Sequence, residues 1–409
     1  MIKQLVIIFF LGFSSGLPIS LVSSTLQAWF ADAGLSIWVT GLMSLISVPY
    51  LYRFLWAPLL DRYSLLNLGK RRSWILLMQM LISIGLYLLS GYSPQHSPWI
   101  MAGLTLFIAT CSATQDAAID AHRTEYLSLP LHGLGASIAT IAYRLALLVS
   151  GGLALIIAQY YGWGVTYRLM SGLMMLGMIA IAMSPEPSQH TQPDASLLTL
   201  FIDPVRDLLS RHELLAFCLF IIFFKAGEVF TTSISGIVMP FFIQGLHFSL
   251  ATIGYVTKVW GVAAIIIGGL IGGAILVRHS LYQSLLYFGL LQALTNGIFI
   301  LLATTKPHTW LLMLAVFSDN FAAGMGSTAL VALMMRFVDH RFTATQFSIL
   351  ASMVGVPRVL SGPIGAFFQE KLGWSGLYII AFMLAFAFIP FLYRLRRQPI
   401  FQMKKYPNN

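Results

Sequence analysis

The chain has 409 residues, of which 58% are hydrophobic and only 9% are charged. Soluble domains carry about 25% charged residues, so this composition excludes a water-soluble enzyme. It also excludes a nucleic-acid-binding protein, because a net charge of +10 in such an apolar chain is better explained by membrane sidedness. One transmembrane helix needs about 20 apolar residues, so the hydrophobic residues suffice for about twelve helices.

Twelve hydrophobic runs follow one another along the chain, and each is long enough for a membrane-spanning helix. A β-barrel would instead show alternating segments of about ten residues, so we expect an all-α polytopic membrane protein. The first run is expected to be a retained helix, since no small-residue cleavage site follows a short apolar core. The expected spans are 5–31, 37–60, 73–92, 99–124, 133–160, 163–183, 214–244, 250–275, 281–303, 309–337, 343–368 and 374–393.

A polar stretch at 184–213 separates six runs from the next six and is the predicted domain boundary. Its second half begins Asp203-Pro204, where Asp suits a helix cap and Pro the first helical position, so we expect a short amphipathic helix on the membrane surface. The predicted domains are an N-terminal six-helix bundle at 1–183, a cytoplasmic linker at 184–213, a C-terminal six-helix bundle at 214–394 and a basic cytoplasmic tail at 395–409.

The two halves of the chain repeat at a constant offset of 211 residues. Paired Trp and Tyr residues at one fixed spacing make chance a poor explanation, and a duplication of this kind is typical of transporters built from two pseudo-symmetric bundles. The matched pairs are Ser150-Gly151 with Ser361-Gly362, Gly162-Trp163 with Gly373-Trp374, Tyr167 with Tyr378, and Gly34-Leu35 with Gly245-Leu246.

The positive charges are consistent with twelve spans and with both termini on the cytoplasmic side. This topology places sixteen of the 24 Lys and Arg residues in inner loops and tails, against three, Arg168, Lys306 and Lys371, in outer loops. Such a bias agrees with the positive-inside rule.

Ionisable residues inside the predicted spans are the main functional candidates, because each costs at least about 2.5 kcal/mol on insertion scales. We expect the carboxylates to be proton-coupling residues, since a desolvated carboxylate beside changing partners titrates at accessible pH. Structural ion pairs that lock helices together are the alternative. Lys225 and Glu228 (i, i+3) can meet on one helix face, and Asp116 and Asp120 (i, i+4) share one. The intramembrane candidates are Asp116, Asp120, Glu228 and Asp319 among the acids, and Arg144, Lys225, Lys258 and Arg358 among the bases.

Metal, haem and disulfide chemistry are not predicted, and neither is a cofactor. The nine histidines fall in loops or near helix ends, and Cys111 and Cys218 lie inside apolar runs. A nucleophile-elbow pattern at Gly12-Phe-Ser-Ser-Gly16 lacks the strand–turn–helix context that the elbow needs, so a close helix contact explains it better. We therefore do not expect an enzyme.

The loop Asp61-Arg62-Tyr63 followed by Gly69-Lys70-Arg71-Arg72 resembles the inter-helix signature of the major facilitator superfamily. Its charged residues Asp61, Arg62, Lys70, Arg71 and Arg72 either enforce topology or form a gate between the two bundles. Motifs spread over essentially the whole chain are similar to the anhydromuropeptide permease (AmpG) family, namely GFSSGLP at 12–18, TLQAW at 25–29, FLWAPLLDRY at 54–63, QD at 115–116 with DA at 120–121, YR at 143–144, SGGLA at 150–154 and ATQF at 344–347.

The resemblance implies an inner-membrane permease of Gram-negative bacteria with the twelve-helix fold of that superfamily. Such a permease imports N-acetylglucosaminyl-1,6-anhydro-N-acetylmuramyl peptides from periplasm to cytoplasm, by proton-coupled alternating access, for peptidoglycan recycling. Two departures leave the cargo open among paralogues: Glu228 stands where the family usually has Asp, and some members carry further C-terminal helices.

For such an anionic glycopeptide, Arg144, Lys225 and Arg358 are the candidates to bind carboxylates. Gln27, Gln115, Asn320 and Gln346 are the candidates to bind sugar hydroxyls and amides. The expected partners are the bilayer, the glycopeptide and protons, without nucleic acid, for a protein that acts as a monomer.

Two alternatives stay open from the sequence. One is a permease of the same fold for another solute, such as a siderophore or an exported drug. The other is a non-transporting receptor or a membrane enzyme, which the fixed-period duplication disfavours.

Overall fold

The computed structural model describes residues 2–56, 60, 63–65, 68–127, 132–186, 197–211, 213–231, 236–338, 343–398 and 401. These residues form helices, turns and irregular segments with no strand among them, which confirms the all-α class. The chain divides into two compact units, one of Met1–Pro193 with Phe248–Lys258 (unit 1) and one of Asp194–His247 with Val259–Asn409 (unit 2).

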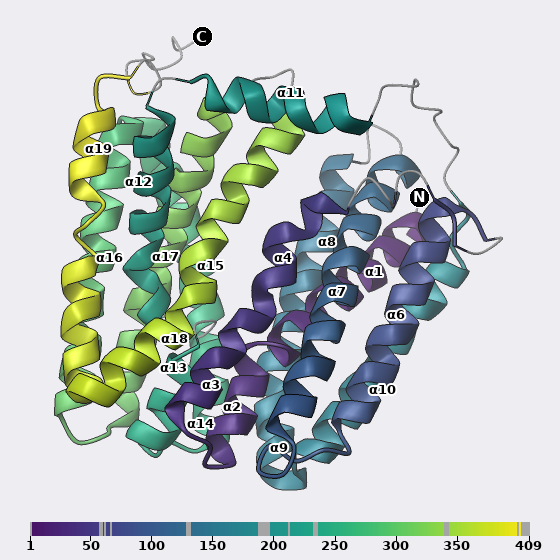
Figure 1. Cartoon of the computed structure of the whole chain (residues 1–409), viewed down its shortest axis with the longest axis horizontal. Helices are drawn as coiled ribbons and strands as arrows, with labels where there is room; N and C mark the ends of the chain where they lie inside the picture. Colours follow the sequence, from purple (N-terminus) through teal and green to yellow (C-terminus); the bar gives the residue numbers. More distant parts are fainter. Residues whose placement is uncertain are drawn as a thin grey trace. The chain divides into compact units, whose positions relative to one another are not determined.

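Unit 1 is a bundle in which α1 packs against α7, α8 and α10, and α6 packs against α7 and α10 (Figure 1). A short helix from further along the chain, α14 (Leu250–Gly254), packs on α9 and completes the unit. The other helices are α1 (Ile2–Leu21), α2 (Ser24–Asp32), α3 (Ile37–Leu42), η1 (Met43–Ser47), α4 (Val48–Tyr52), η2 (Arg53–Leu55), α6 (Lys70–Leu89), α7 (Pro98–Tyr126), α8 (His132–Leu147), the π-helix η4 (Leu148–Leu153), α9 (Ala154–Tyr161) and α10 (Trp163–Ala182).

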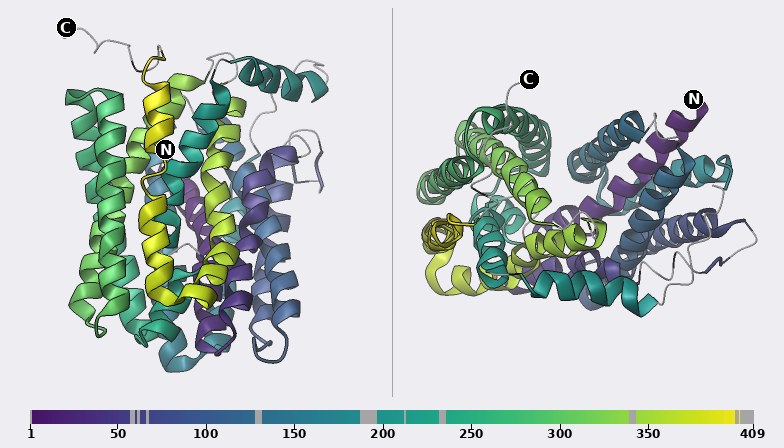
Figure 2. Two further views of the ribbon diagram at one scale, coloured as in Figure 1. Left: turned by 60° about the vertical axis from the view of Figure 1, so that its left-hand side comes forward. Right: turned by 90° about the horizontal axis from the view of Figure 1, so that it is seen from above.

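In unit 2, α17 packs against α15 and α16, and α12 packs against α18 and α19. The first helix of the unit, α11, packs against α18 at one end of the unit, as Figure 1 and Figure 2 show. The helices are α11 (Leu197–Leu209), α12 (Leu214–Ala226), η5 (Glu228–Phe230), α13 (Val238–Pro240), the π-helix η6 (Phe241–Gly245), α15 (Gly261–Arg278), α16 (Leu281–Thr304), α17 (Thr309–Phe337), α18 (Thr343–Leu384) and α19 (Ile389–Leu395). A further π-helix, η7 (Tyr255–Trp260), contains the boundary at Lys258.

The amphipathic linker helix is present, but it begins earlier than the sequence predicted. Helix α11 starts at Leu197, so Asp203 and Pro204 lie inside it and do not form its cap. The apolar residues before Asp203 extend the helix toward the N-terminus, because they continue its apolar stripe. Leu208 is buried in unit 2, whereas Ile202 and Leu209 are exposed.

Seven stretches of the described chain are long and apolar enough to cross a membrane. Helices α7 and α17, at 29 residues each, also have the length, since a bilayer core of about 30 Å needs about 20 helical residues. Each carries an internal aspartate, which lowers its mean hydropathy, and neither is among the seven apolar stretches. The predicted count of twelve membrane-spanning helices stays a prediction. The seven are Ile2–Asp32, Lys70–Leu89, Ile138–Tyr161, Trp163–Ala182, Leu250–Leu276, Leu281–Thr304 and Ile349–Leu395.

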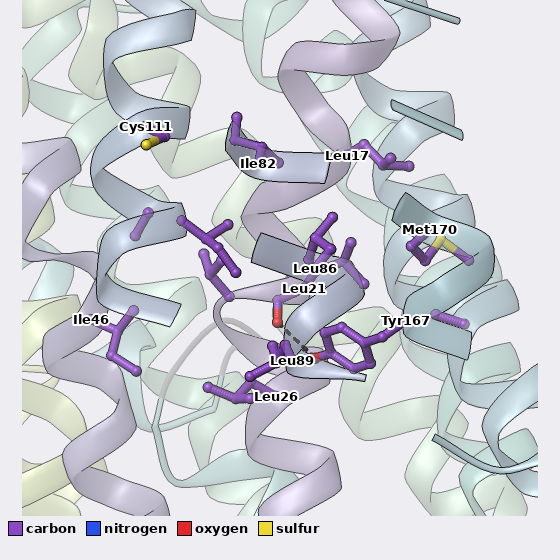
Figure 3. Close-up of a cluster of buried hydrophobic side chains, with 14 of the residues drawn as sticks. Leu17, Leu21, Leu26, Ile46, Ile82, Leu86, Leu89, Cys111, Tyr167 and Met170 are labelled. Carbon is purple, nitrogen blue, oxygen red and sulfur yellow. Dashed lines mark hydrogen bonds between the residues drawn. The ribbon is translucent and has the colours of Figure 1, made fainter. Parts of the chain in front are cut away.

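The first predicted span is interrupted near its middle. Helix α1 ends at Leu21, three residues after Pro18, and α2 begins at Ser24. The end of α1 lies in a buried apolar cluster, where the Tyr167 hydroxyl donates to the Leu21 carbonyl at 2.8 Å (Figure 3). A carbonyl at a helix end has no partner within its helix, and this hydroxyl supplies one. The break is therefore held by tertiary contacts.

Gly12 and Gly16 bring α1 into close contact with α8. A Cβ added to Gly12 would lie 2.8 Å from the Ala139 carbonyl oxygen, and one added to Gly16 would lie 2.6 Å from that of Tyr143. Small residues four apart allow such backbone contact between membrane helices. This confirms that the pattern at Gly12–Gly16 serves helix packing.

The internal repeat is visible in the backbone of both units. Gly162 and Gly373, related by the 211-residue offset, both have left-handed backbone, with φ of 82° and 70°. In unit 1 the Thr25 hydroxyl donates to the Ser150 carbonyl at 2.7 Å. The equivalent pair in unit 2 is also bonded, because the Gly236 N–H donates to the Ser361 hydroxyl at 3.4 Å.

Gly162→Ala is expected to lower stability by about 1–2 kcal/mol, because an L side chain is disfavoured at positive φ. No heavy atom lies within 4 Å of the added Cβ, so the effect is one of backbone conformation. Thermal unfolding of the purified protein in detergent measures it. Gly172→Ala is the matched control, since that glycine is helical and equally uncrowded. Equal unfolding temperatures for the two variants would contradict the assignment.

Candidate functional site

Asp116 of α7 lies buried in unit 1 and faces α1. The Ser15 hydroxyl donates to Asp116 Oδ1 at 2.6 Å. The preceding residue, Gln115, donates its side-chain amide to the Ser14 carbonyl at 2.9 Å, and Gln79 donates to the Ser14 hydroxyl at the same distance. Among the described residues no cation is hydrogen-bonded to Asp116, so its negative charge is not neutralised by an ion pair.

Asp120 does not join Asp116 in the buried region. Its side chain is 53% exposed and forms an ion pair with Arg123 at 3.1 Å. Spacing of four residues puts two side chains on one helix face, but Asp120 is exposed although its neighbours Ile119 and His122 are buried. The structure therefore gives Asp120 the environment of a surface ion pair.

Asp319 of α17 is fully buried in unit 2. Its Oδ1 atom accepts hydrogen bonds from the Thr231 hydroxyl and the Gln292 side-chain amide, each at 2.7 Å. Its Oδ2 atom is buried without a partner in the described part of the chain. Asn296, one turn after Gln292, donates to the Gly227 carbonyl at 2.7 Å and so ties α16 to the end of α12. Within the described segments, this carboxyl group has polar neighbours but no bonded cation.

Lys225 and Glu228 meet as their spacing predicted. The Lys225 ammonium donates to the two carboxylate oxygens of Glu228 at 3.0 and 2.9 Å, and to the Ser327 hydroxyl at 2.9 Å. The two side chains are only 6% and 14% exposed. Their charges cancel locally, so the structure does not leave Lys225 free for an anionic ligand.

Other cations lack such partners. Arg144 is exposed and Arg358 is half-buried, and neither side chain forms a hydrogen bond or ion pair with another described residue. Arg53 and Lys258 of unit 1 share this property, Arg53 half-buried and Lys258 only 6% exposed. Arg53 was not among the residues predicted from the sequence.

The predicted amide ligands have different environments. Gln27 is fully buried, and neither its amide oxygen nor its amide nitrogen has a partner among the described residues. Asn320 donates to the Val316 carbonyl of its own helix at 2.8 Å. Gln346 donates to Asp207 at 2.7 Å and accepts from Arg211 at 3.2 Å, so it ties α18 to the linker helix. Gln27 fits a ligand-binding role best, whereas Gln346 has a structural contact.

The predicted gating residues Asp61 and Arg62 lie outside the described residues. Arg71 forms a bidentate ion pair with Glu125, and the backbone N–H groups of Arg71 and Arg72 donate to Glu186 at 2.8 and 3.1 Å. Arg72 also donates to the Ala182 carbonyl at the end of α10.

These contacts join the start of α6 to the ends of α7 and α10, all within unit 1. Lys70 begins α6 and is half-buried. Arg71 and Arg72 therefore stabilise the contact between these helix ends inside unit 1. Their role as gating residues stays a prediction.

The site residues predicted from the sequence did not include Thr231, Gln292 and Asn296, three polar residues around Asp319. Gln292 and Asn296 could have been predicted from the sequence. They are side-chain amides four residues apart inside the apolar run 281–303, so they lie on one helix face. Ser15, the partner of Asp116, carried no comparable signal.

The family model for the Major Facilitator Superfamily matches residues 5–360 and 226–404 of the chain. The Anhydromuropeptide permease of Escherichia coli (strain K12) is 38% identical over 376 residues, which cover 92% of this chain and 76% of that one. An uncharacterised protein of Haemophilus influenzae is 33% identical, with 94% of this chain and 92% of that one covered. The Putative transporter AmpG 4 of Rickettsia conorii is 28% identical, with 92% and 93% covered.

Solved structures with the same fold are more distant in sequence. The nucleoside transporter NupG aligns with a TM-score of 0.74 at 15% identity, covering 96% of this chain and all of that one. A POT family transporter in complex with 5-aminolevulinic acid aligns with a TM-score of 0.72 at 15% identity, covering 96% and 95%. At this identity the likeness shows the fold alone.

Lys225→Met is expected to destabilise the protein by about 3–5 kcal/mol, because it leaves the Glu228 carboxylate buried and unpaired. Adding Glu228→Gln to it removes that charge and is expected to restore most of the loss. Chemical denaturation in detergent measures both variants. Arg123→Met, which breaks the exposed pair with Asp120, is the control and is expected to cost at most about 1 kcal/mol. A double variant as unstable as the single one would show that the pair is not the cause.

Proposed function

Because the chain belongs to the major facilitator superfamily and, within it, to the anhydromuropeptide permease family, we propose that it transports anhydromuropeptides. Its cargo is N-acetylglucosaminyl-1,6-anhydro-N-acetylmuramic acid, with or without a stem peptide. The direction is import across the bacterial inner membrane, from periplasm to cytoplasm, by proton-coupled alternating access. The protein acts as a monomer with both termini in the cytoplasm, and the imported fragments enter peptidoglycan recycling.

The single observation that carries this proposal is the surplus of unpaired positive charge in the candidate spans. Lys225 is neutralised by Glu228, whereas Arg144, Lys258 and Arg358 have no bonded acid among the described residues. Cations inside a membrane domain are costly unless they pair or face a polar path. Anhydromuropeptides carry carboxylates on the muramyl lactyl group or on the stem peptide, and these anions provide the missing partners.

The cargo also carries acetamido groups, each with one N–H donor and one carbonyl acceptor. The unpartnered side-chain amide of Gln27 offers the complementary acceptor and donor. Leaving both atoms of a buried amide unbonded costs free energy, so a ligand that bonds both is favoured. Gln27 is therefore the proposed residue for an acetamido group.

Proton coupling is assigned to Asp116 and Asp319. Each accepts a hydroxyl hydrogen bond, from Ser15 and Thr231 respectively, and neither is bonded to a cation among the described residues. A desolvated carboxyl group without a cation is stabilised by taking up a proton, and an Asp319 Oδ2 atom without a partner leaves room for one. Asp120 is excluded from this role because it is exposed and paired.

The cargo is tested by uptake of labelled anhydromuropeptide into proteoliposomes that contain the purified protein. A pH gradient, acid outside, is expected to drive accumulation above the external concentration, and an uncoupler is expected to abolish it. Competition by unlabelled anhydromuropeptide, but not by a siderophore, would distinguish this cargo from that of another permease of the same fold. A protein that binds the label but shows neither uptake nor counterflow would be a receptor, contrary to the proposal.

Asp116→Asn and Asp319→Asn are expected to reduce gradient-driven accumulation to the level measured with the uncoupler. Each variant still has a polar side chain that fills the site, so counterflow of labelled against unlabelled cargo should continue. Asp120→Asn is the matched control on the same helix as Asp116 and is expected to accumulate cargo like the wild type. Full accumulation by both Asp116→Asn and Asp319→Asn would refute the carboxylate assignment.

A further inference from the structure

Two π-helical turns meet in unit 1 at a point that carries a buried lysine. The first is η4 (Leu148–Leu153), which contains Gly151 and Gly152, and the second is η7, which contains Lys258. π-Turns inside α-helices are rare and frequently mark functional sites, because they widen the helix at a cost in packing. The side chain of Lys258 is only 6% exposed, although it lies inside the candidate span Leu250–Leu276.

The glycines shape a slot for this lysine. A Cβ added to Gly151 would lie 2.3 Å from Lys258 Cε and 2.7 Å from its Nζ, and one added to Gly152 would lie 2.9 Å from Lys258 Cβ. A side chain at either position would therefore displace the lysine. Gly254, one turn before Lys258, packs with equal closeness, since its added Cβ would lie 2.9 Å from the Gly152 carbonyl oxygen. The Lys258 side chain therefore packs directly on the backbone of Gly151 and Gly152, in space that only glycine leaves open.

The ammonium group of Lys258 has nothing to bind in the part of the chain that the structure describes. It forms no hydrogen bond and no ion pair there, whereas Lys225, buried to a similar degree in unit 2, bonds to Glu228 and Ser327. An unpaired buried charge is strongly unfavourable, yet the π-turns and the glycines are arranged around this one. Structural pairing therefore does not account for Lys258.

We propose that Lys258 is a specificity-determining residue whose ammonium group binds a carboxylate of the transported cargo. This inference rests on the proposed function and adds the group that distinguishes acidic muropeptides from neutral ones. Gly151 and Gly152 position the ammonium group and do not touch the cargo themselves. A charged hydrogen bond formed in a desolvated slot contributes enough to discriminate between a carboxylate and a carboxamide.

The test compares two probes that differ only in charge. One is an anhydromuropeptide with a stem peptide, and the other is the same molecule with its carboxylates converted to carboxamides. Binding to the full-length protein in detergent is measured for the wild type and for Lys258→Met. The variant is expected to bind the acidic probe about ten- to a hundredfold more weakly than the wild type, and the amidated probe within about twofold of it.

A second pair of variants tests whether binding depends on where the Lys258 ammonium group lies, and not only on its presence. Gly151→Ala keeps the lysine but displaces its ammonium group, so it is expected to weaken binding of the acidic probe selectively. Gly172→Ala adds a methyl group where no heavy atom lies within 4 Å and is expected to bind both probes like the wild type. Binding of the amidated probe reports in each case that the variant is folded.

Each other outcome overturns the inference. If Lys258→Met loses affinity for both probes alike, the lysine supports the fold and does not select the cargo. If it binds both probes like the wild type, Lys258 has no part in binding, while the proposed function stands. If the wild type binds neither probe, the proposed function fails, and the inference fails with it.

Discussion

The cost of a charge inside a membrane is the constraint on which this structure depends. Every ionisable side chain in a span must be paired, held neutral or used by a ligand, because hydrocarbon offers no other solvation. The described residues divide accordingly. Lys225 and Glu228 pair with each other, Asp116 and Asp319 have hydroxyl and amide neighbours, and cations such as Arg144 and Lys258 form no ion pair among these residues. The function is assigned to the groups that internal pairing does not explain.

The two units have kept the same scaffold, but their buried polar groups differ. Offset by 211 residues, the left-handed glycines Gly162 and Gly373 are retained. The same offset takes Asp116 to Ser327 and Ser14 to Lys225, so the two units carry different polar groups at equivalent positions. Turns and packing contacts repeat because both bundles need them, whereas the polar centres are free to specialise. This division of labour suits a transporter whose two halves handle different parts of a charged cargo.

Length, hydropathy and the 211-residue offset were enough to predict the helical class and the internal repeat, because lipid forces long apolar helices and duplication preserves spacing. The contact between Lys225 and Glu228 was also predictable, since residues three apart meet on a helix. Asp120 shares a helix face with Asp116, as its spacing predicted, but it is exposed and paired with Arg123, and helical spacing alone does not give the burial of a side chain. The start of α11 was placed six residues late, because a Pro inside a surface helix resembles a first-turn Pro.

Other features depend on tertiary contacts that spacing cannot reveal. The pairing of Gln346 with Asp207 joins residues 139 apart in the sequence, and the slot around Lys258 needs glycines more than a hundred residues away. The site at Asp319 likewise combines three separate helical segments. In each case the residue type suggested a polar role, but only the fold distinguishes a structural contact from an unpartnered group.

Infrared difference spectroscopy between acidic and alkaline pH detects proton uptake by Asp116 and Asp319, because a protonated carboxyl group has its own carbonyl-stretching band. A pH-dependent band of this kind is expected in the wild-type protein, reduced in Asp116→Asn and in Asp319→Asn and lost in the double variant. A band that is unchanged in the double variant would show that these two carboxyl groups do not carry the transported proton.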